Sequence, residues 1–212
     1  MCALSETKGM KLNMKINHKL DVIFVLDKSG SMSSNTDETI SNFNEYLEKE
    51  KNNKYETFVT TMLFNQTNHF LHKALPVHNI KPLTKKDYYA QGCTALYDAL
   101  GDAIHYMENK KTDKVLFVII TDGYENASVK YNQKTIFKKI NSHKDWEFLY
   151  IGADIDSYQA GGNIGIQRER IANFKKGKTG TSKLFRAIEN FEYGMMSEEA
   201  DYDLEKWKDE LD

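Results

Sequence analysis

The sequence is poor in cysteine and proline, and it has no long apolar run. Its 212 residues include only two cysteines, Cys2 and Cys93, so a disulfide framework is excluded and a reducing compartment is the simplest expectation. No window approaches the roughly eighteen consecutive apolar residues that a membrane span requires. The N-terminal stretch lacks the continuous apolar segment of a signal peptide. These absences favour a cytoplasmic protein without a membrane partner.

The charge shows no excess of either sign. Lysine and arginine number 29 and aspartate and glutamate 31, which gives a formal net charge of -2. Such a balance predicts neither a nucleic-acid-binding surface nor a polybasic membrane patch. The hydrophobic fraction of 40% is enough for one packed domain. We therefore predict a leader over 1–18, one domain over 19–193, and an acidic C-terminal helix or tail over 194–212.

Within this domain, short apolar runs alternate with segments of helical periodicity. Strands are predicted at 21–27, 55–65, 69–77, 114–123, 146–154 and near 169–174, and helices at 35–51, 94–110, 130–143, after Asp156 and at 181–191. This alternation is typical of a three-layer α/β fold, with a mostly parallel sheet of about six strands and helices on both faces. The short link before 69–77 predicts a hairpin and hence one antiparallel strand, which Pro76 assigns to the sheet edge.

The last stretch, SEEADYDLEKWKDELD, is strongly acidic and has an apolar stripe. Leu204, Trp207 and Leu211 fall on one face of a helix. The more common arrangement is that such a stripe packs on its own domain. The alternative is a detachable acidic helix that docks a partner.

Oxygen-bearing side chains occur where two predicted strands end and where a helix begins. Asp27, Ser29 and Ser31 leave the first strand at every second residue, Thr94 opens a helix, and Asp122 ends a buried strand. Ligands of open α/β sheets gather at the carboxyl ends of the strands, so we expect these five side chains to meet. Two carboxylates and three hydroxyls suit a hard cation such as Mg²⁺. Few of these ligands are charged, so a bound ion would stay electrophilic enough to take a carboxylate from another molecule.

Three segments carry a family resemblance. DKSGSM, GCTALYDAL and VIITDGYEN resemble the metal-ion-dependent adhesion site of von Willebrand factor type A (vWA) domains, and the similarity covers roughly residues 20–190. The chain is most similar to stand-alone bacterial and phage members. The resemblance implies a Rossmann-like fold and a divalent ion, Mg²⁺ with Mn²⁺ or Ca²⁺ also suitable. It also implies a protein partner that donates Asp or Glu. The ion-binding residues that it implies are Asp27, Ser29, Ser31, Thr94 and Asp122, the last usually acting through water.

We therefore expect a non-catalytic, magnesium-dependent interaction domain. The loops 32–36, 78–93 and 123–130 would set its specificity, and Tyr88-Tyr89 and Tyr124 would supply aromatic anchors. Two alternatives stay open, a metal-dependent hydrolase or phosphatase and a structural subunit with an unused site. Phosphate chemistry requires a converging lysine or arginine, and Lys28 is the only basic residue within the three motifs.

Two other features are given structural interpretations. KKGKT at 175–179 lacks the glycine spacing of a phosphate-binding loop and is interpreted as a basic turn. Cys93, next to the proposed ligand Thr94, is interpreted as a small packed thiol.

Overall fold

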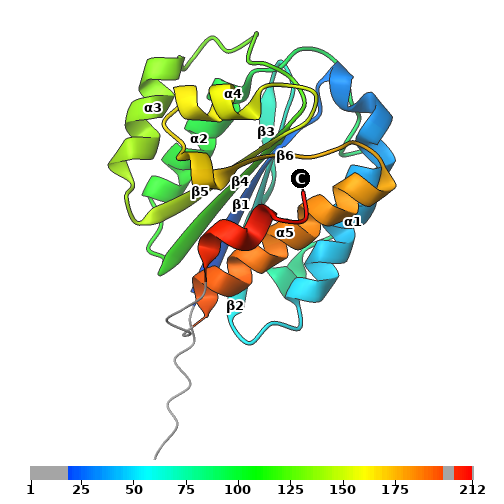
Figure 1. The fold of residues 1–212 in the computed structure, drawn as a ribbon, viewed down its shortest axis with the longest axis vertical. Coiled ribbons are helices and arrows are strands. Elements are labelled where there is room, and N and C mark those ends of the chain that lie inside the picture. Colours follow the sequence, from blue (N-terminus) through cyan, green and yellow to red (C-terminus); the bar gives the residue numbers. More distant parts are fainter. Residues whose placement is uncertain (1–18, 198–202, 212) are drawn as a thin grey trace, which may run out of the picture.

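The structure, a computed structural model, describes residues 19–197 and 203–211, and the predicted leader 1–18 lies outside this range. Six strands form one sheet in the order β3-β2-β1-β4-β5-β6 (Figure 1). Their bounds are β1 (Lys19–Asp27), β2 (Glu56–Phe64), β3 (Asn68–Pro76), β4 (Lys114–Thr121), β5 (Trp146–Gly152) and β6 (Ile171–Asn173). All neighbouring strands pair in parallel except β2 and β3.

Helices cover both faces of this sheet (Figure 1). α1 (Thr36–Glu50) and α5 (Lys178–Met196) lie on one face, and α2 (Leu96–Glu108), α3 (Gln133–Ser142) and α4 (Ser157–Asn163) lie on the other. The three-layer α/β prediction is confirmed, including the single antiparallel strand at the edge. Within the described residues, no helix is long and apolar enough to cross a membrane.

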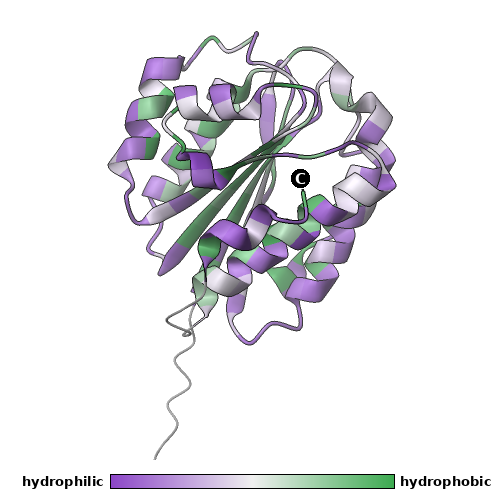
Figure 2. Cartoon of the chain, in the orientation of Figure 1, coloured by the Kyte–Doolittle hydropathy of each residue, from purple (hydrophilic) through white to green (hydrophobic). Residues whose placement is uncertain are grey.

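The continuous apolar runs of β1 and β4 follow from their central position. Successive side chains of a strand point to opposite faces, so Phe24 joins the core under α1 and α5, whereas Val25 joins the core under α2. Both side chains are fully buried. Helices cover both faces of the sheet, so neither set of positions can be polar. Figure 2 shows the resulting hydrophobic strands between helices with hydrophilic outer surfaces.

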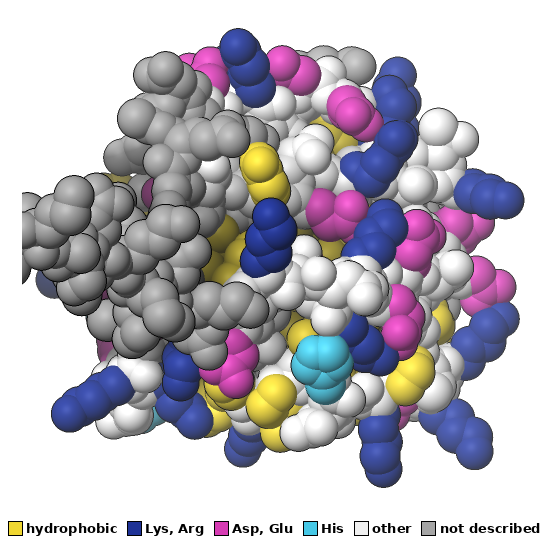
Figure 3. All heavy atoms as spheres, turned by 90° about the horizontal axis from the view of Figure 1, so that it is seen from below, with side chains coloured by type: hydrophobic (Ala, Val, Ile, Leu, Met, Phe, Trp, Pro, Cys, Tyr) yellow, Lys and Arg dark blue, Asp and Glu magenta, His cyan; other side chains and the backbone are white. Residues whose placement is uncertain are grey.

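Short 3-10 helices replace some of the predicted loops. η1 (Gly30–Asn35) occupies the end of the first motif, where the loop 32–36 was predicted. η2 (Val77–Asn79) and η3 (Arg168–Arg170) flank β3 and β6. On the face seen in Figure 3, basic and acidic side chains are interspersed, which matches the balanced composition.

The described part of the acidic C-terminal segment packs on its own domain. It forms η4 (Leu204–Lys208), a short 3-10 helix, where a helix or a tail was expected. Trp207 is 1% exposed, lies edge-on to Phe191 of α5, and donates its indole N–H to the carbonyl of Glu169 at 2.8 Å. Leu211 is also buried. Residues 198–202 and 212 of this segment lie outside the described range.

A buried acidic pair lies between α1 and α5. Glu192 is fully buried and accepts a hydrogen bond from the Tyr46 hydroxyl at 2.8 Å. Burial, followed by the charge of Glu50, raises the pKa of Glu192 well above its usual value. Burial raises the pKa of Glu50 as well, and the hydrogen bonds that it accepts from Thr57 and Asn53, which favour its ionised form, oppose this shift. Glu192 therefore keeps its proton to a higher pH than an exposed glutamate does.

The mutation Glu192→Gln should stabilise the protein at pH 8 more than at pH 5. The pKa of Glu192 is the higher one in the folded state, so its stabilising effect is fully present below the usual value of 4.5 and is lost as the pH rises towards the folded-state pKa. Within that window the free energy of unfolding falls by up to about 1.4 kcal/mol per pH unit. Glutamine keeps the acceptor for Tyr46 without an ionisable group. Calorimetric melting at both pH values measures the effect.

The exposed α1 residue Glu48 supplies a control, because Glu48→Gln removes a carboxylate that lies in solvent. A Glu192→Gln protein that melts no higher than wild type at pH 8 would contradict the proton-linked burial of Glu192.

Candidate metal centre

The candidate site lies at the carboxyl ends of the two central strands. Asp27 is the last residue of β1, and Asp122 directly follows β4, its hydrogen-bonded neighbour. From this pair the chain proceeds outward in opposite directions, to β2 and β3 on one side and to β5 and β6 on the other. Strand order reverses at such a point, and the diverging connections leave a crevice where ligands bind in open α/β sheets.

The first and third motifs meet through their side chains. The Ser29 backbone N–H donates to Asp27 Oδ1 at 2.6 Å, which folds the chain back as it leaves β1. The hydroxyls of Ser29 and Ser31 are 3.1 Å apart. The Ser31 hydroxyl donates to Asp122 Oδ1 at 2.5 Å, across 91 residues of sequence. These contacts join four of the five predicted donors into one continuous oxygen cluster.

Thr94 completes the cluster from the second motif. A Cβ placed on Gly123 would lie 2.8 Å from Thr94 Oγ1 and 3.6 Å from Ser31 Oγ, so the threonine hydroxyl lies beside the cluster and leaves no room for a side chain at 123. The Thr94 N–H donates to Asn126 Oδ1 at 2.9 Å, and the Asn126 N–H donates back to the Thr94 carbonyl at 3.0 Å. The structure thus brings together all five residues singled out in the sequence, and it couples the second and third motifs.

The donors differ in their exposure. Asp27, Ser29, Thr94 and Asp122 are buried, between 0% and 4% exposed, whereas Ser31 is exposed. The cluster is therefore enclosed by protein on most sides and opens to solvent at Ser31.

Asp27 has no compensating positive charge among the described side chains. Its carboxylate accepts hydrogen bonds from Ser29 N–H and from the Thr121 hydroxyl at 2.6 Å. Burial, together with a smaller effect of the nearby Asp122, nevertheless raises the pKa of Asp27 from 3.8 to about 6, because a desolvated and repelled carboxylate disfavours its charged form. A cation at this position would relieve both effects.

The residues present fit a hard divalent ion. Among the described residues no three His, Cys, Asp or Glu side chains gather as metal ligands. The predicted site does not require such a group, because three of its five donors are hydroxyls. An all-oxygen set with two carboxylates matches the ligand preference of Mg²⁺ and excludes a soft-metal site.

Tyr88 supports the site from a distance, a role that the sequence did not indicate. The hydroxyl of Tyr88 donates to the Asp27 carbonyl, 61 residues away, and its ring is fully buried. The prediction that Tyr88 supplies an aromatic anchor is therefore wrong, because its ring is buried and its hydroxyl binds the carbonyl at the end of β1. Its neighbour Tyr89 is 64% exposed and Tyr124 is 51% exposed.

The prediction that Cys93 is a packed thiol is wrong, because Cys93 is exposed. Its backbone N–H donates to the Gln66 amide oxygen.

A lysine from outside the three motifs also reaches the site. Lys176, in the turn between β6 and α5, places its ammonium 2.5 Å from Asp122 Oδ2 and 2.9 Å from Asp154 Oδ2. Among the described residues Asp122 Oδ2 is buried and accepts no hydrogen bond, so the Lys176 ammonium compensates it as an ion pair. Asp154 follows β5 as Asp122 follows β4, so the same pattern, an acid at a strand end, was available in the sequence. For Lys176 the sequence carried no signal beyond a basic turn.

Comparison of the sequence with protein families identifies one match. Residues 7–138 match the family described as VWA domain containing CoxE-like protein. Since the match covers more than half of the chain, the protein belongs to this family. No curated protein matches the chain.

Solved structures agree on the fold. Proximal thread matrix protein 1 from the mussel byssus has a TM-score of 0.59 at 16% identity, over 79% of this chain and 44% of that one. A von Willebrand factor type A protein from Catenulispora acidiphila has a TM-score of 0.58 at 13% identity, over 81% and 42%. The vWF domain of the type V pili tip protein Mfa5 from Porphyromonas gingivalis has a TM-score of 0.63 at 9% identity, over 87% of this chain and 99% of that one.

This chain thus spans less than half the length of the first two of these proteins. At such low identities the likeness establishes the fold alone. One further structure of the mussel protein is described as having a zinc-occupied MIDAS (metal-ion-dependent adhesion site) motif. It has a TM-score of 0.55 at 14% identity, over 80% of this chain and 44% of that one.

The mutation Asp27→Asn should leave the metal-free protein at least as stable as wild type at pH 8. The substitution keeps the acceptor for Ser29 and removes a buried charge. Because the folded-state pKa of Asp27 is the raised one, its stabilising effect is fully present below 3.8 and is lost as the pH rises through about 6. The stability difference between variant and wild type should therefore grow over this window and be constant above it, as measured by calorimetry in chelator. A variant clearly less stable than wild type at pH 8 would contradict an uncompensated charge at Asp27.

Proposed function

We propose that this protein is a magnesium-dependent protein-interaction domain, in which a carboxylate from a partner completes the coordination of a bound ion. The observation that carries this proposal is the cluster of five oxygen donors around a buried, uncompensated Asp27, open to solvent at Ser31. The family membership and the zinc-occupied MIDAS motif described for the mussel protein support it.

The five donors would have two different roles at the ion. Asp27 and Asp122 supply the negative charge, and Ser29, Ser31 and Thr94 supply neutral hydroxyls. A bound Mg²⁺ would supply an electrophilic position that attracts an anionic oxygen, because five donors leave one position open in its preferred shell of six oxygens and only two of the donors are charged. The Tyr88 hydroxyl and the Asn126 side chain hold the donor loops in register.

The exposed aromatic side chains beside the site suit a protein partner. Tyr89 directly follows Tyr88, and Tyr124 follows Gly123, so both lie in loops whose neighbouring residues touch the cluster. The Tyr124 hydroxyl accepts the backbone N–H of Asp156 at 2.9 Å, which fixes the ring position. Rigid, half-exposed tyrosines are typical anchors of protein interfaces.

We further propose that the domain is not catalytic. Lys176 is the basic residue that a phosphate-handling site would need, and it does reach the cluster. However, its ammonium faces three oxygens of this protein, on Asp122, Asp154 and the Ser31 backbone. These contacts engage the ammonium with groups of this protein, so a substrate phosphate would have to displace them.

A melting experiment tests the metal requirement. Saturating Mg²⁺ should raise the melting temperature of wild type, because an ion that binds only the folded state stabilises it by about 2.7 kcal/mol at a hundredfold excess over its Kd. Ser31→Ala should reduce the shift, and Asp27→Asn should abolish it. Ser33→Ala, which removes an exposed hydroxyl from the same 3-10 helix, is the matched control.

A peptide screen tests the partner chemistry. Random peptides selected on the protein in Mg²⁺ should share an Asp or Glu and lose at least tenfold in affinity when that residue becomes Asn or Gln. Chelator should abolish the binding. Selected peptides that lack an acidic residue, or that bind equally well in chelator, would contradict the proposal, and turnover of phosphoester substrates abolished by Asp27→Asn would favour a hydrolase instead.

A further inference from the structure

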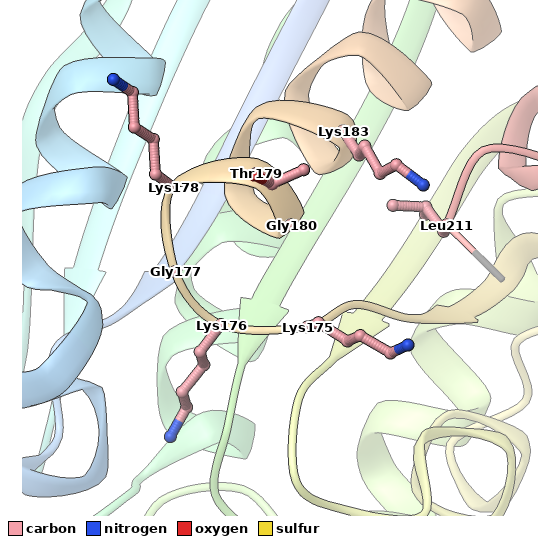
Figure 4. Close-up of a pocket in the computed structure, with 8 residues that line it drawn as sticks. All are labelled: Lys175, Lys176, Gly177, Lys178, Thr179, Gly180, Lys183 and Leu211. Atoms are coloured by element: carbon pink, nitrogen blue, oxygen red, sulfur yellow. The ribbon is translucent and has the colours of Figure 1, made fainter.

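The turn between β6 and α5 carries a side chain that the proposed function does not use. Lys176 is one of four lysines at 175, 176, 178 and 183, but its ammonium points away from that of Lys175 (Figure 4). It lies 2.5 Å from Asp122 Oδ2, 2.9 Å from Asp154 Oδ2 and 3.2 Å from the Ser31 carbonyl oxygen. The ammonium is thus held among oxygens from three separate segments that border the metal centre.

The backbone on both sides of Lys176 is fixed. The Phe174 N–H donates to the Gly152 carbonyl at 2.9 Å, which extends the pairing of β5 and β6. The Gly177 N–H donates to Asn35 Oδ1 at 2.8 Å, and Asn35 is fully buried at the end of η1. Gly177 has a φ of 101°, a conformation that glycine adopts without strain. The backbone that carries Lys176 is therefore fixed on both sides, so only its side-chain torsions must be ordered for the ammonium to reach Asp122.

The carboxylates on either side of the ammonium differ in burial. The Asp122 side chain is 0% exposed, the Lys176 side chain 20% and the Asp154 side chain 69%. A charge pair on the buried oxygen of Asp122 is little screened by solvent, whereas the contact with Asp154 is weak. Asp154 offers Lys176 a second, solvent-facing partner on the outer side of the site.

Lys176 and a divalent ion require the same carboxylate. An ion held by Asp122 would lie beside the ammonium, and like charges repel strongly in a partly buried site. We infer that Lys176 is a tethered competitor of the ion: its ammonium neutralises Asp122 in the metal-free protein and moves aside, towards Asp154 and solvent, when an ion binds. This inference rests on the proposed metal site. Lys176 then sets the ion affinity and keeps the metal-free fold stable.

Metal binding by variants tests the inference. Lys176→Met should bind Mn²⁺ on the order of tenfold more tightly than wild type, equivalent to about 1.4 kcal/mol, as counted by the paramagnetic signal of free Mn²⁺. Lys175→Met removes the same charge from the same turn, but its ammonium points elsewhere (Figure 4), so its affinity should change by less than threefold. In chelator Lys176→Met should melt lower than wild type, and saturating Mn²⁺ should close the gap.

The outcomes separate this inference from the proposed function. If wild type binds Mn²⁺ and Asp27→Asn does not, the metal site stands, and an affinity of Lys176→Met equal to or weaker than that of Lys175→Met then overturns the competitor role alone. If neither wild type nor Lys176→Met binds Mn²⁺, both proposals fail. Binding by Lys176→Met alone would support the competitor role and contradict metal-dependent docking in the wild-type protein.

A measurement on wild type covers the case in which Lys176→Met does not fold. Acetylation of lysine amines by an activated ester, quantified by mass spectrometry, reports how free each ammonium is. Mg²⁺ should raise the labelling of Lys176 severalfold and leave that of Lys175 unchanged. Labelling of Lys176 that stays constant or falls with Mg²⁺ would overturn the inference.

Discussion

Two carboxylates buried at neighbouring strand ends impose the electrostatic constraint on which the site depends. Asp27 and Asp122 are held out of solvent by the helices and loops around β1 and β4, so their charge must be neutralised within the protein. Hydrogen bonds from Ser29 and Thr121 stabilise Asp27 only in part, since its pKa remains raised. Asp122 has the ammonium of Lys176. The site thus requires positive charge, which Lys176 supplies to Asp122 and no described side chain supplies to Asp27.

The scaffold explains how this arrangement is maintained. Strands covered on both faces cannot shift register without placing a new set of side chains in each core, so the ends of β1 and β4 are fixed points. Loops from other parts of the chain are then attached to these points through single polar side chains. Tyr88 binds the end of β1, Asn126 joins the second and third motifs, and Asn35 holds the turn of Lys176. Such contacts keep charged groups close together that would otherwise separate.

The sequence predicted the layers, the single antiparallel edge strand and the meeting of the five oxygen donors, because each depends on local pattern. Apolar runs and helical periodicity define strands and helices, and the carboxyl ends of parallel strands share one edge. Contacts made through single side chains over long separations were not predictable. Tyr88 was expected to be an aromatic anchor, and nothing in KKGKT indicated that Lys176 reaches Asp122, 54 residues earlier in the sequence. The exposure of Cys93 likewise depends on the path of one loop.

A crystal structure of wild type grown with Mn²⁺, with anomalous scattering recorded at the manganese edge, is the most direct measurement. An anomalous peak in contact with the Ser29 and Ser31 hydroxyls, between Asp27 and Asp122, is the result expected. A fully occupied manganese elsewhere on the protein, or no peak at a concentration that raises the melting temperature, would contradict a metal centre at the ends of β1 and β4.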